Sequence, residues 1–87
     1  MAAKLNVKII TPKRVVFDGT ALAVTIPTES GEIQVYPGHI PVLARVAAGT
    51  VGLENPGAAP QLFEVDEGFF RVTPDDVSLL IDNAEPA

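Results

Sequence analysis

The chain has 87 residues, one histidine and no cysteine, so it has room for a single domain and lacks both disulfides and the ligands of a usual zinc cage. Eleven acidic and six basic side chains give a net charge of −5, which disfavours binding to nucleic acid or to an anionic lipid surface. No apolar run approaches the roughly 18 residues of a membrane span, so we expect a soluble intracellular domain over residues 1–87, monomeric in isolation and without direct lipid anchoring.

The N-terminal third of the chain predicts three short strands. Residues 4–10 alternate between apolar and polar side chains, which is typical of a strand with one wet face. A turn over residues 11–14 leads to Val15 and Phe17, and a second turn is predicted at Asp18 and Gly19. Residues 21–26 follow as a strand that Pro27 ends. In this strand the side chains predicted to point inward are Leu22, Val24 and Ile26, with Ala21, Ala23 and Thr25 pointing the other way.

The middle of the chain contains the only segment where a helix competes with a strand. A strand over residues 32–36 ends at Pro37 and Gly38. In residues 39–48, Ile40, Leu43 and Ala47 fall at helical spacing, but the internal proline and the valines favour a short extended segment.

The remaining segments alternate regularly. The sequence predicts strands over residues 50–54, 62–66, 69–73 and 77–81, with a loop over residues 55–60. Together with 23 β-branched residues, this pattern predicts an all-β fold, a small antiparallel β-sandwich or flattened barrel of about eight to ten short strands. The predicted inward side chains of the last three strands are Phe63, Val65, Phe70, Val72, Val77, Leu79 and Ile81.

Three bulky apolar residues take the outward phase on these last three strands. Leu62, Phe69 and Leu80 lie among charged neighbours and form an exposed apolar patch for a partner; alternatively, a neighbouring loop covers this face or the three are isolated surface residues.

No catalytic, metal or phosphate site emerges from the motifs. Glu32 and His39 could act as an acid and base pair, as in a small hydrolase or isomerase, but no nucleophile accompanies them. The carboxylates lack the spacing of a calcium loop, and neither glycine-rich phosphate-binding motif occurs. We therefore predict a non-catalytic protein without cofactor or metal.

An ordered set of motifs resembles one known family. Residues 31–43, GEIQVYPGHIPVL, are similar to a strand and turn in the N-terminal β-sandwich of the epsilon subunit of F-type ATP synthases. The resemblance continues in residues 5–12, 16–19, 48–51 and 67–72 and so covers essentially the whole chain. It departs from the family where a C-terminal helical hairpin would begin, because the sequence given stops at Ala87; we therefore expect that hairpin, and inhibition of hydrolysis by it, to be absent.

The resemblance implies a rotor subunit in the central stalk of the proton-translocating ATP synthase. Such a subunit links the gamma subunit to the c-ring and couples proton flow to ATP synthesis, as a peripheral protein on the cytoplasmic side of the energy-transducing inner membrane. The implied c-ring contacts are Glu29, Ser30, Gly31, Glu32 and His39. The implied gamma contacts are Tyr36, His39, Ile40 and Leu43, although Ile40 and Leu43 could equally be core residues. Polar loops of such rings commonly carry Arg and Gln, which suits Glu29 and Glu32.

The alternative function is a stand-alone β-sandwich module that binds a ligand or peptide. A carbohydrate site of that kind would need an aromatic-lined groove, and the chain has one tyrosine, four phenylalanines and no tryptophan.

Overall fold

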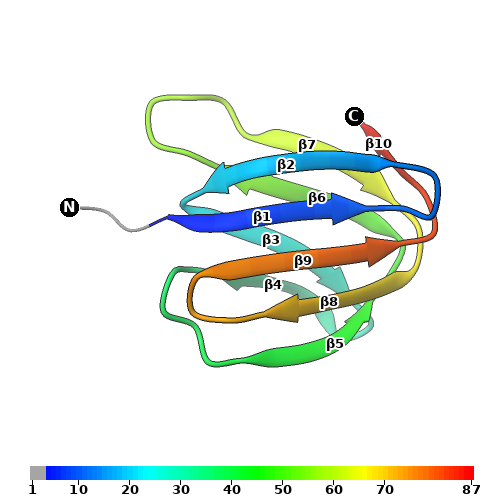
Figure 1. Cartoon of the computed structure of the whole chain (residues 1–87), viewed down its shortest axis with the longest axis horizontal. Coiled ribbons are helices and arrows are strands. Elements are labelled where there is room, and N and C mark those ends of the chain that lie inside the picture. Colours follow the sequence, from blue (N-terminus) through cyan, green and yellow to red (C-terminus); the bar gives the residue numbers. More distant parts are fainter. Residues whose placement is uncertain (1–3) are drawn as a thin grey trace.

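The protein is a sandwich of two five-stranded sheets (Figure 1). The computed structural model describes residues 4–87, so residues 1–3 of the predicted domain lie outside the described residues. In spatial order, the first sheet contains β2 (Val15–Ala21), β1 (Leu5–Ile10), β9 (Asp76–Ile81), β8 (Gly68–Val72) and β5 (Val42–Val46). The second sheet contains β10 (Ala84–Pro86), β7 (Gln61–Val65), β6 (Gly49–Glu54), β3 (Ala23–Thr28) and β4 (Gly31–Val35). The predicted all-β sandwich is confirmed.

One strand pair departs from the predicted antiparallel arrangement. β1 and β9 run parallel in the middle of the first sheet, from Asn6 opposite Asp76 to Ile10 opposite Leu80. The other seven strand pairs among the described residues are antiparallel. A parallel pair cannot be closed by a hairpin, so it joins strands that lie far apart in the sequence. Alternation of apolar residues shows which side of a strand is buried, but not the direction of its neighbour.

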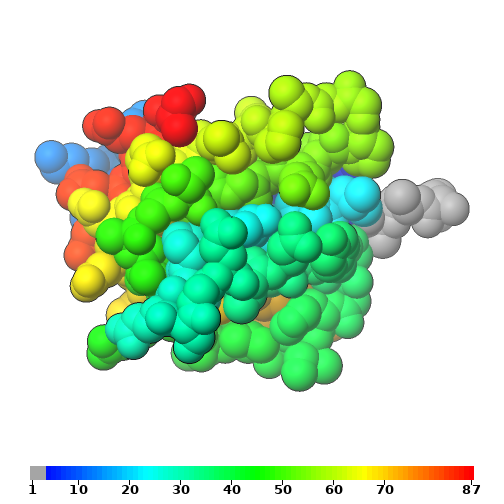
Figure 2. Space-filling model, turned by 180° about the vertical axis from the view of Figure 1, so that it is seen from behind, coloured from blue at the N-terminus to red at the C-terminus, as the bar shows by residue number. Residues whose placement is uncertain are grey.

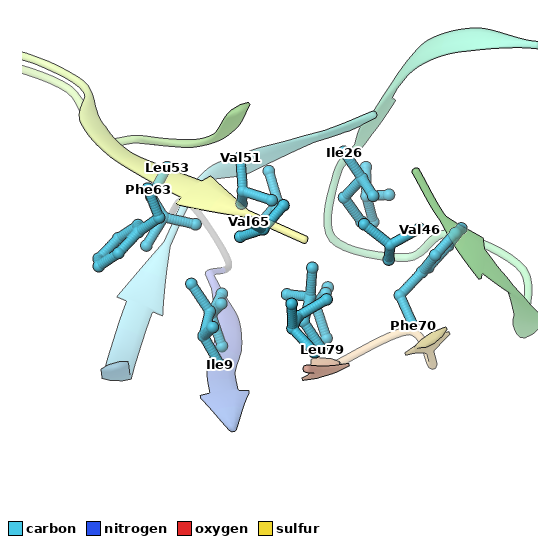
Figure 3. Close-up of a cluster of buried hydrophobic side chains, with 14 of the residues drawn as sticks. Ile9, Ile26, Val46, Val51, Leu53, Phe63, Val65, Phe70 and Leu79 are labelled. Carbon is cyan, nitrogen blue, oxygen red and sulfur yellow. The ribbon is translucent and has the colours of Figure 1, made fainter. Parts of the chain in front are cut away.

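The core lies between the two sheets, as Figure 3 shows. All seven predicted inward residues of the last three strands are buried, which confirms their phase. No polar or charged residue is buried in the described part of the chain. An aromatic pair closes one side of the core, where the rings of Phe17 and Phe63 meet edge to face with centroids 5.6 Å apart.

The predicted turn at Asp18 and Gly19 is wrong. β2 continues through both residues, which pair with Lys8 and Val7 of β1. A Cβ atom on Gly19 would lie 2.8 Å from Cζ of Phe17, so this glycine leaves room for the aromatic ring within a strand.

Pro27 does not end the third strand, and the predicted phase of that strand is wrong in part. The chain bends at Leu22 as it passes from the first sheet to the second, so Ala21 and Ala23 are both buried and Leu22 only half-buried. β3 then runs to Thr28. Its ladder with β6 covers only the first three residues of β3, so the missing N–H of Pro27 removes no bond from that ladder.

The segment with competing helical spacing is extended, as predicted, and forms β5. The loop at residues 55–60 is also confirmed, since β6 ends before it and β7 begins after it. The short strand β10 was not predicted as a separate element. Its three residues pair with β7 and form the edge of the second sheet.

Candidate docking surfaces

The first candidate surface is the turn between β3 and β4. Glu29 and Ser30 form a two-residue loop between the paired residues Thr28 and Gly31. Gly31 has a φ of 115°, a conformation that glycine adopts without steric cost, and its carbonyl accepts a hydrogen bond from the Thr28 hydroxyl. These residues and the following Glu32 are exposed, except for the half-buried Thr28. The turn therefore presents two carboxylates on a short, backbone-fixed loop.

The second candidate surface is the loop that follows β4. The amide of His39 donates to the carbonyl of Tyr36 at 3.2 Å, and the amide of Gly38 donates to the carbonyl of Pro74 at 2.9 Å. The latter bond fastens the loop to the turn between β8 and β9. Nδ1 of His39 lies 2.7 Å from the carbonyl oxygen of Ile40, so Nδ1 donates there, and in the neutral ring Nε2 is then the acceptor.

These two surfaces lie at opposite ends of β4. The strand runs from Gly31 to Val35, a rise of about 13 Å at ~3.3 Å per residue, and His39 lies further along the chain. Figure 1 shows the turn between β3 and β4 at one end of the sandwich and the connection from β4 to β5 at the other. His39 is therefore separated from the other four residues predicted to contact the c-ring. Because Glu32 and His39 lie at opposite ends, they also cannot form the acid and base pair considered from the sequence.

Ile40 and Leu43 are surface residues, so their alternative assignment to the core is wrong. Ile40 is 72% exposed and Leu43 is 74% exposed, while Tyr36 is 50% exposed. Leu43 lies on β5 directly opposite Arg71 of β8, on the outer face of the first sheet. All four residues predicted to contact gamma thus lie on one continuous segment, from the end of β4 into β5.

The predicted apolar patch is divided between two sheets. Phe69 and Leu80 are direct cross-strand neighbours on the outer face of the first sheet, and both are exposed. Leu62 is exposed as well, but it lies on β7 of the second sheet, so the prediction of a single patch on adjacent strands is wrong. β7 and β8 are consecutive in sequence, yet the connection between them crosses from one sheet to the other.

On the first sheet, the exposed pair of Phe69 and Leu80 is extended by two residues that the sequence pattern did not indicate. Leu80 pairs with Ile10, which in turn pairs with Val15, an exposed residue of β2. We call Val15, Ile10, Leu80 and Phe69 the apolar row, since they cross four adjacent strands. The guanidinium of Arg45 lies over the Phe69 ring, 5.9 Å from its centroid. Strand order is needed to find this row, because its members come from both halves of the chain.

Charge is divided between the sheets. All six basic residues lie on strands of the first sheet or next to them: Lys4, Lys8, Lys13, Arg14, Arg45 and Arg71. The strands of the second sheet carry four glutamates and no basic residue: Glu32, Glu54, Glu64 and Glu85. Figure 2 views the molecule from the side of this acidic sheet. The two outer faces therefore suit partners of different charge.

The described residues show neither a metal centre nor an aromatic groove. No three His, Asp or Glu side chains within residues 4–87 converge as metal ligands. A hollow beside the turn of Glu29 has a volume of about 320 Å³. Its lining includes both the guanidinium of Arg45 and the carboxylates of Glu67 and Asp82. The two exposed aromatic residues do not line one groove. Tyr36 follows β4 of the second sheet, whereas Phe69 lies on β8 of the first sheet. The same residues include no helix with the length and hydropathy of a membrane span.

Comparison with known proteins identifies relatives over almost the whole chain. The family model for the β-sandwich domain of the ATP synthase delta/epsilon chain matches residues 4–87. The chain is 36% identical over 86 residues to the ATP synthase epsilon chain of Parvibaculum lavamentivorans, covering 99% of this chain and 65% of that relative. It is 39% identical over 85 residues to the epsilon chain of Macrococcus caseolyticus, covering 97% and 62%. The chain thus spans a little under two thirds of the length of these relatives.

Two solved structures share the fold. A chain in the cryo-EM structure of the Euglena gracilis mitochondrial ATP synthase, described as OSCP/F1/c-ring, superposes with a TM-score of 0.89 at 23% identity, covering 97% of this chain and 54% of that one. A chain in the central stalk/c-ring structure of the Tetrahymena thermophila mitochondrial ATP synthase gives a TM-score of 0.74 at 17% identity, covering 94% and 66%.

Proposed function

The chain belongs to the ATP synthase delta/epsilon family, and from this premise we propose that it is a non-catalytic rotor subunit of the central stalk. In this role it links the gamma subunit to the c-ring and couples proton flow to ATP synthesis. The curated relatives are named epsilon chains, and the titles of the two structural neighbours name a c-ring or a central stalk. These names supply the partners of the proposal.

The observation that carries the proposal is the separation of two exposed loops by one strand. β4 is paired along its length with β3, and β3 is paired in turn with β6, so its two ends are held at a fixed distance. A sandwich with a fully apolar core transmits displacement because closely packed interiors deform little. A subunit that joins two partners under torque needs two contacts on one stiff body.

We assign the acidic turn to the c-ring. Glu29 and Glu32 flank the exposed Ser30 and Gly31, and they can accept charge-assisted hydrogen bonds from basic and amide groups in polar loops. A contact of this kind at the rim of an interface fixes register and orientation more than affinity. Because β4 separates His39 from these residues, we do not assign His39 to the c-ring contact.

We assign the opposite end to gamma. Tyr36, Ile40 and Leu43 offer apolar surface, and Nε2 of His39 offers an acceptor to a donor on the partner. The apolar row lies on the same sheet as Leu43, so a partner that covers the outer face of the first sheet can bury both.

The location follows from these contacts. The protein is held at the cytoplasmic side of the energy-transducing membrane through the c-ring rather than by lipid, which agrees with its net charge of −5. We also propose that the isolated chain is a monomer.

The experiment is to mix the purified chain with purified gamma and with detergent-solubilised c-ring, separately and together. We expect a binary complex with gamma and a ternary complex in which the chain contacts both. Size-exclusion chromatography with light scattering would report the composition. Failure to bind either partner would contradict the assignment; binding to gamma alone would remove the c-ring contact and leave the gamma contact standing.

A further inference from the structure

The strand β10 is attached to the sandwich by few interactions. Within residues 4–87 it pairs with β7 alone, through three residue pairs from Ala84 opposite Val65 to Pro86 opposite Phe63. Two backbone hydrogen bonds extend this pairing, from the amide of Asp66 to the carbonyl of Asn83 and from the amide of Ala87 to the carbonyl of Leu62, both at 2.9 Å.

The hydrogen-bonding positions of β10 alternate, and its proline occupies a position that does not need an N–H. In an antiparallel pair every second residue exchanges backbone bonds with its partner. The bonds at positions 83 and 87 place position 85 in the bonded set and Pro86 outside it. The proline therefore removes no bond to β7, and it leaves the outer edge without a donor at that residue.

Little apolar surface holds β10 in place. Ala84 is its only buried residue, 5% exposed, whereas Glu85 and Pro86 are exposed. By comparison, β9, which precedes it in the sequence, buries three side chains in the core. A strand anchored by one methyl group contributes little to the free energy of burial.

A pair of like charges opposes the attachment. Glu85 lies directly opposite Glu64, and like charges in directly opposed cross-strand positions are destabilising. No basic residue lies on any strand of this sheet to compensate, and the connections on either side add Asp66, Glu67 and Asp82. Glu64 accepts a hydrogen bond of 3.1 Å from the hydroxyl of Thr50 on β6, which fixes its carboxylate without neutralising it.

We propose that β10, together with the flanking residues Asn83 and Ala87, forms a releasable strap, which detaches from β7 while the rest of the sandwich stays folded, and that repulsion between Glu64 and Glu85 sets how often it does so. β7 remains in place after release because it pairs with β6 over five positions and buries Phe63 and Val65 in the core. Release exposes the outer edge of β7. This inference does not depend on the proposed partners.

Amide hydrogen exchange of the whole chain, followed residue by residue by NMR, tests the proposal. The reporter is the amide of Asp66, which bonds to the strap but lies far from position 85 in sequence, so its intrinsic exchange rate is unaffected by substitution there. We expect it to exchange faster than the amide of Val51 in the central ladder, through local opening. The variant Glu85→Gln should slow its exchange by about 2- to 5-fold, the range of a cross-strand charge pair.

A matched control is Glu54→Gln, which removes the same charge from the same sheet at a residue that pairs with Ala23 rather than with the strap. It should leave the exchange of Asp66 unchanged. Raising the salt concentration to about 0.5 M should slow exchange in the unmodified chain and have less effect on Glu85→Gln, because exposed charges are screened.

Two results would overturn the proposal. If the amide of Asp66 is protected as strongly as that of Val51, the strap does not open independently of the sandwich. If the strap opens but neither Glu85→Gln nor salt changes its exchange, charge repulsion does not control it.

Discussion

Gly68 lies so close to Leu80 that a Cβ atom at position 68 would overlap the carbonyl oxygen of Leu80. The same atom would lie 2.8 Å from Cα of Ile81, to which Gly68 is paired across β8 and β9. Both obstacles are backbone atoms, which cannot rotate away as a side chain can. The backbones of two strands therefore meet at this point without space for any side chain.

This contact predicts that Gly68→Ala destabilises the fold. We expect the free energy of unfolding to fall by about 1–3 kcal/mol or more, as for other overpacked sites. Urea denaturation followed by circular dichroism would measure the change. The control is Gly52→Ala, whose Cβ would meet a side-chain carbon of Leu62 at an ordinary 3.5 Å. An equal loss in both variants would show that the effect comes from glycine replacement in general rather than from the contact with Leu80.

The two adjacent phenylalanines of β8 are expected to differ in how much their truncation to alanine destabilises the fold. Phe70 is 2% exposed in the core, so Phe70→Ala should lower the free energy of unfolding by about 3–5 kcal/mol. Phe69 is half exposed and is contacted by Arg45, so Phe69→Ala should cost about 1 kcal/mol or less. Thermal and urea unfolding would compare them. The assigned phase of β8 would be wrong if Phe69→Ala proved the more damaging change.

The acidic turn predicts a loss of coupling on charge reversal. Glu32→Lys should leave the isolated domain folded, because Glu32 is exposed, while weakening its binding to the c-ring by about tenfold. ATP synthesis driven by an imposed proton gradient, in vesicles containing the reassembled complex, would measure coupling. The control Glu54→Lys reverses a charge at the other end of the same sheet and should leave binding to the c-ring unchanged. Normal synthesis with Glu32→Lys would remove Glu32 from the c-ring contact.

The exposed leucine of β5 predicts a loss of affinity for gamma. Leu43→Asp should weaken the complex with gamma by at least about tenfold, equivalent to ~1.4 kcal/mol, because it places a charge in apolar surface that the partner would cover. Isothermal titration calorimetry would measure the affinity. Leu62→Asp makes the same change on the second sheet and should have little effect. If the second variant weakens binding and the first does not, gamma meets the second sheet instead.

Much of the fold could be predicted from local pattern. The phase of Phe63, Phe70 and Leu79 follows from alternation with polar neighbours, and the structure buries all three. The two turns at the ends of β4 are also marked in the sequence, by glycines at positions 31 and 38 that adopt positive φ. In contrast, Gly19 predicts a turn from the sequence, and only the structure shows that it leaves room for the ring of Phe17, which packs on Phe63 of the other sheet.

Residue alternation alone predicts a β-sandwich and, on most of its strands, the side chains that face the core, because a period of two requires one buried and one exposed face. The exception is the bend at Leu22, where the phase changes. The segment from Gly31 to Leu43 also carries the resemblance to a known family, but not the exposure of Ile40 and Leu43. Which strands are neighbours is not predicted by alternation and emerges only in the folded chain. Phe69 joins Leu80, Ile10 and Val15 in one row, and Leu62 is excluded from it, because strand order depends on contacts between distant parts of the chain. By contrast, the separation of His39 from Glu32 is local, since it is set by the length of β4, a strand that residue alternation already predicts.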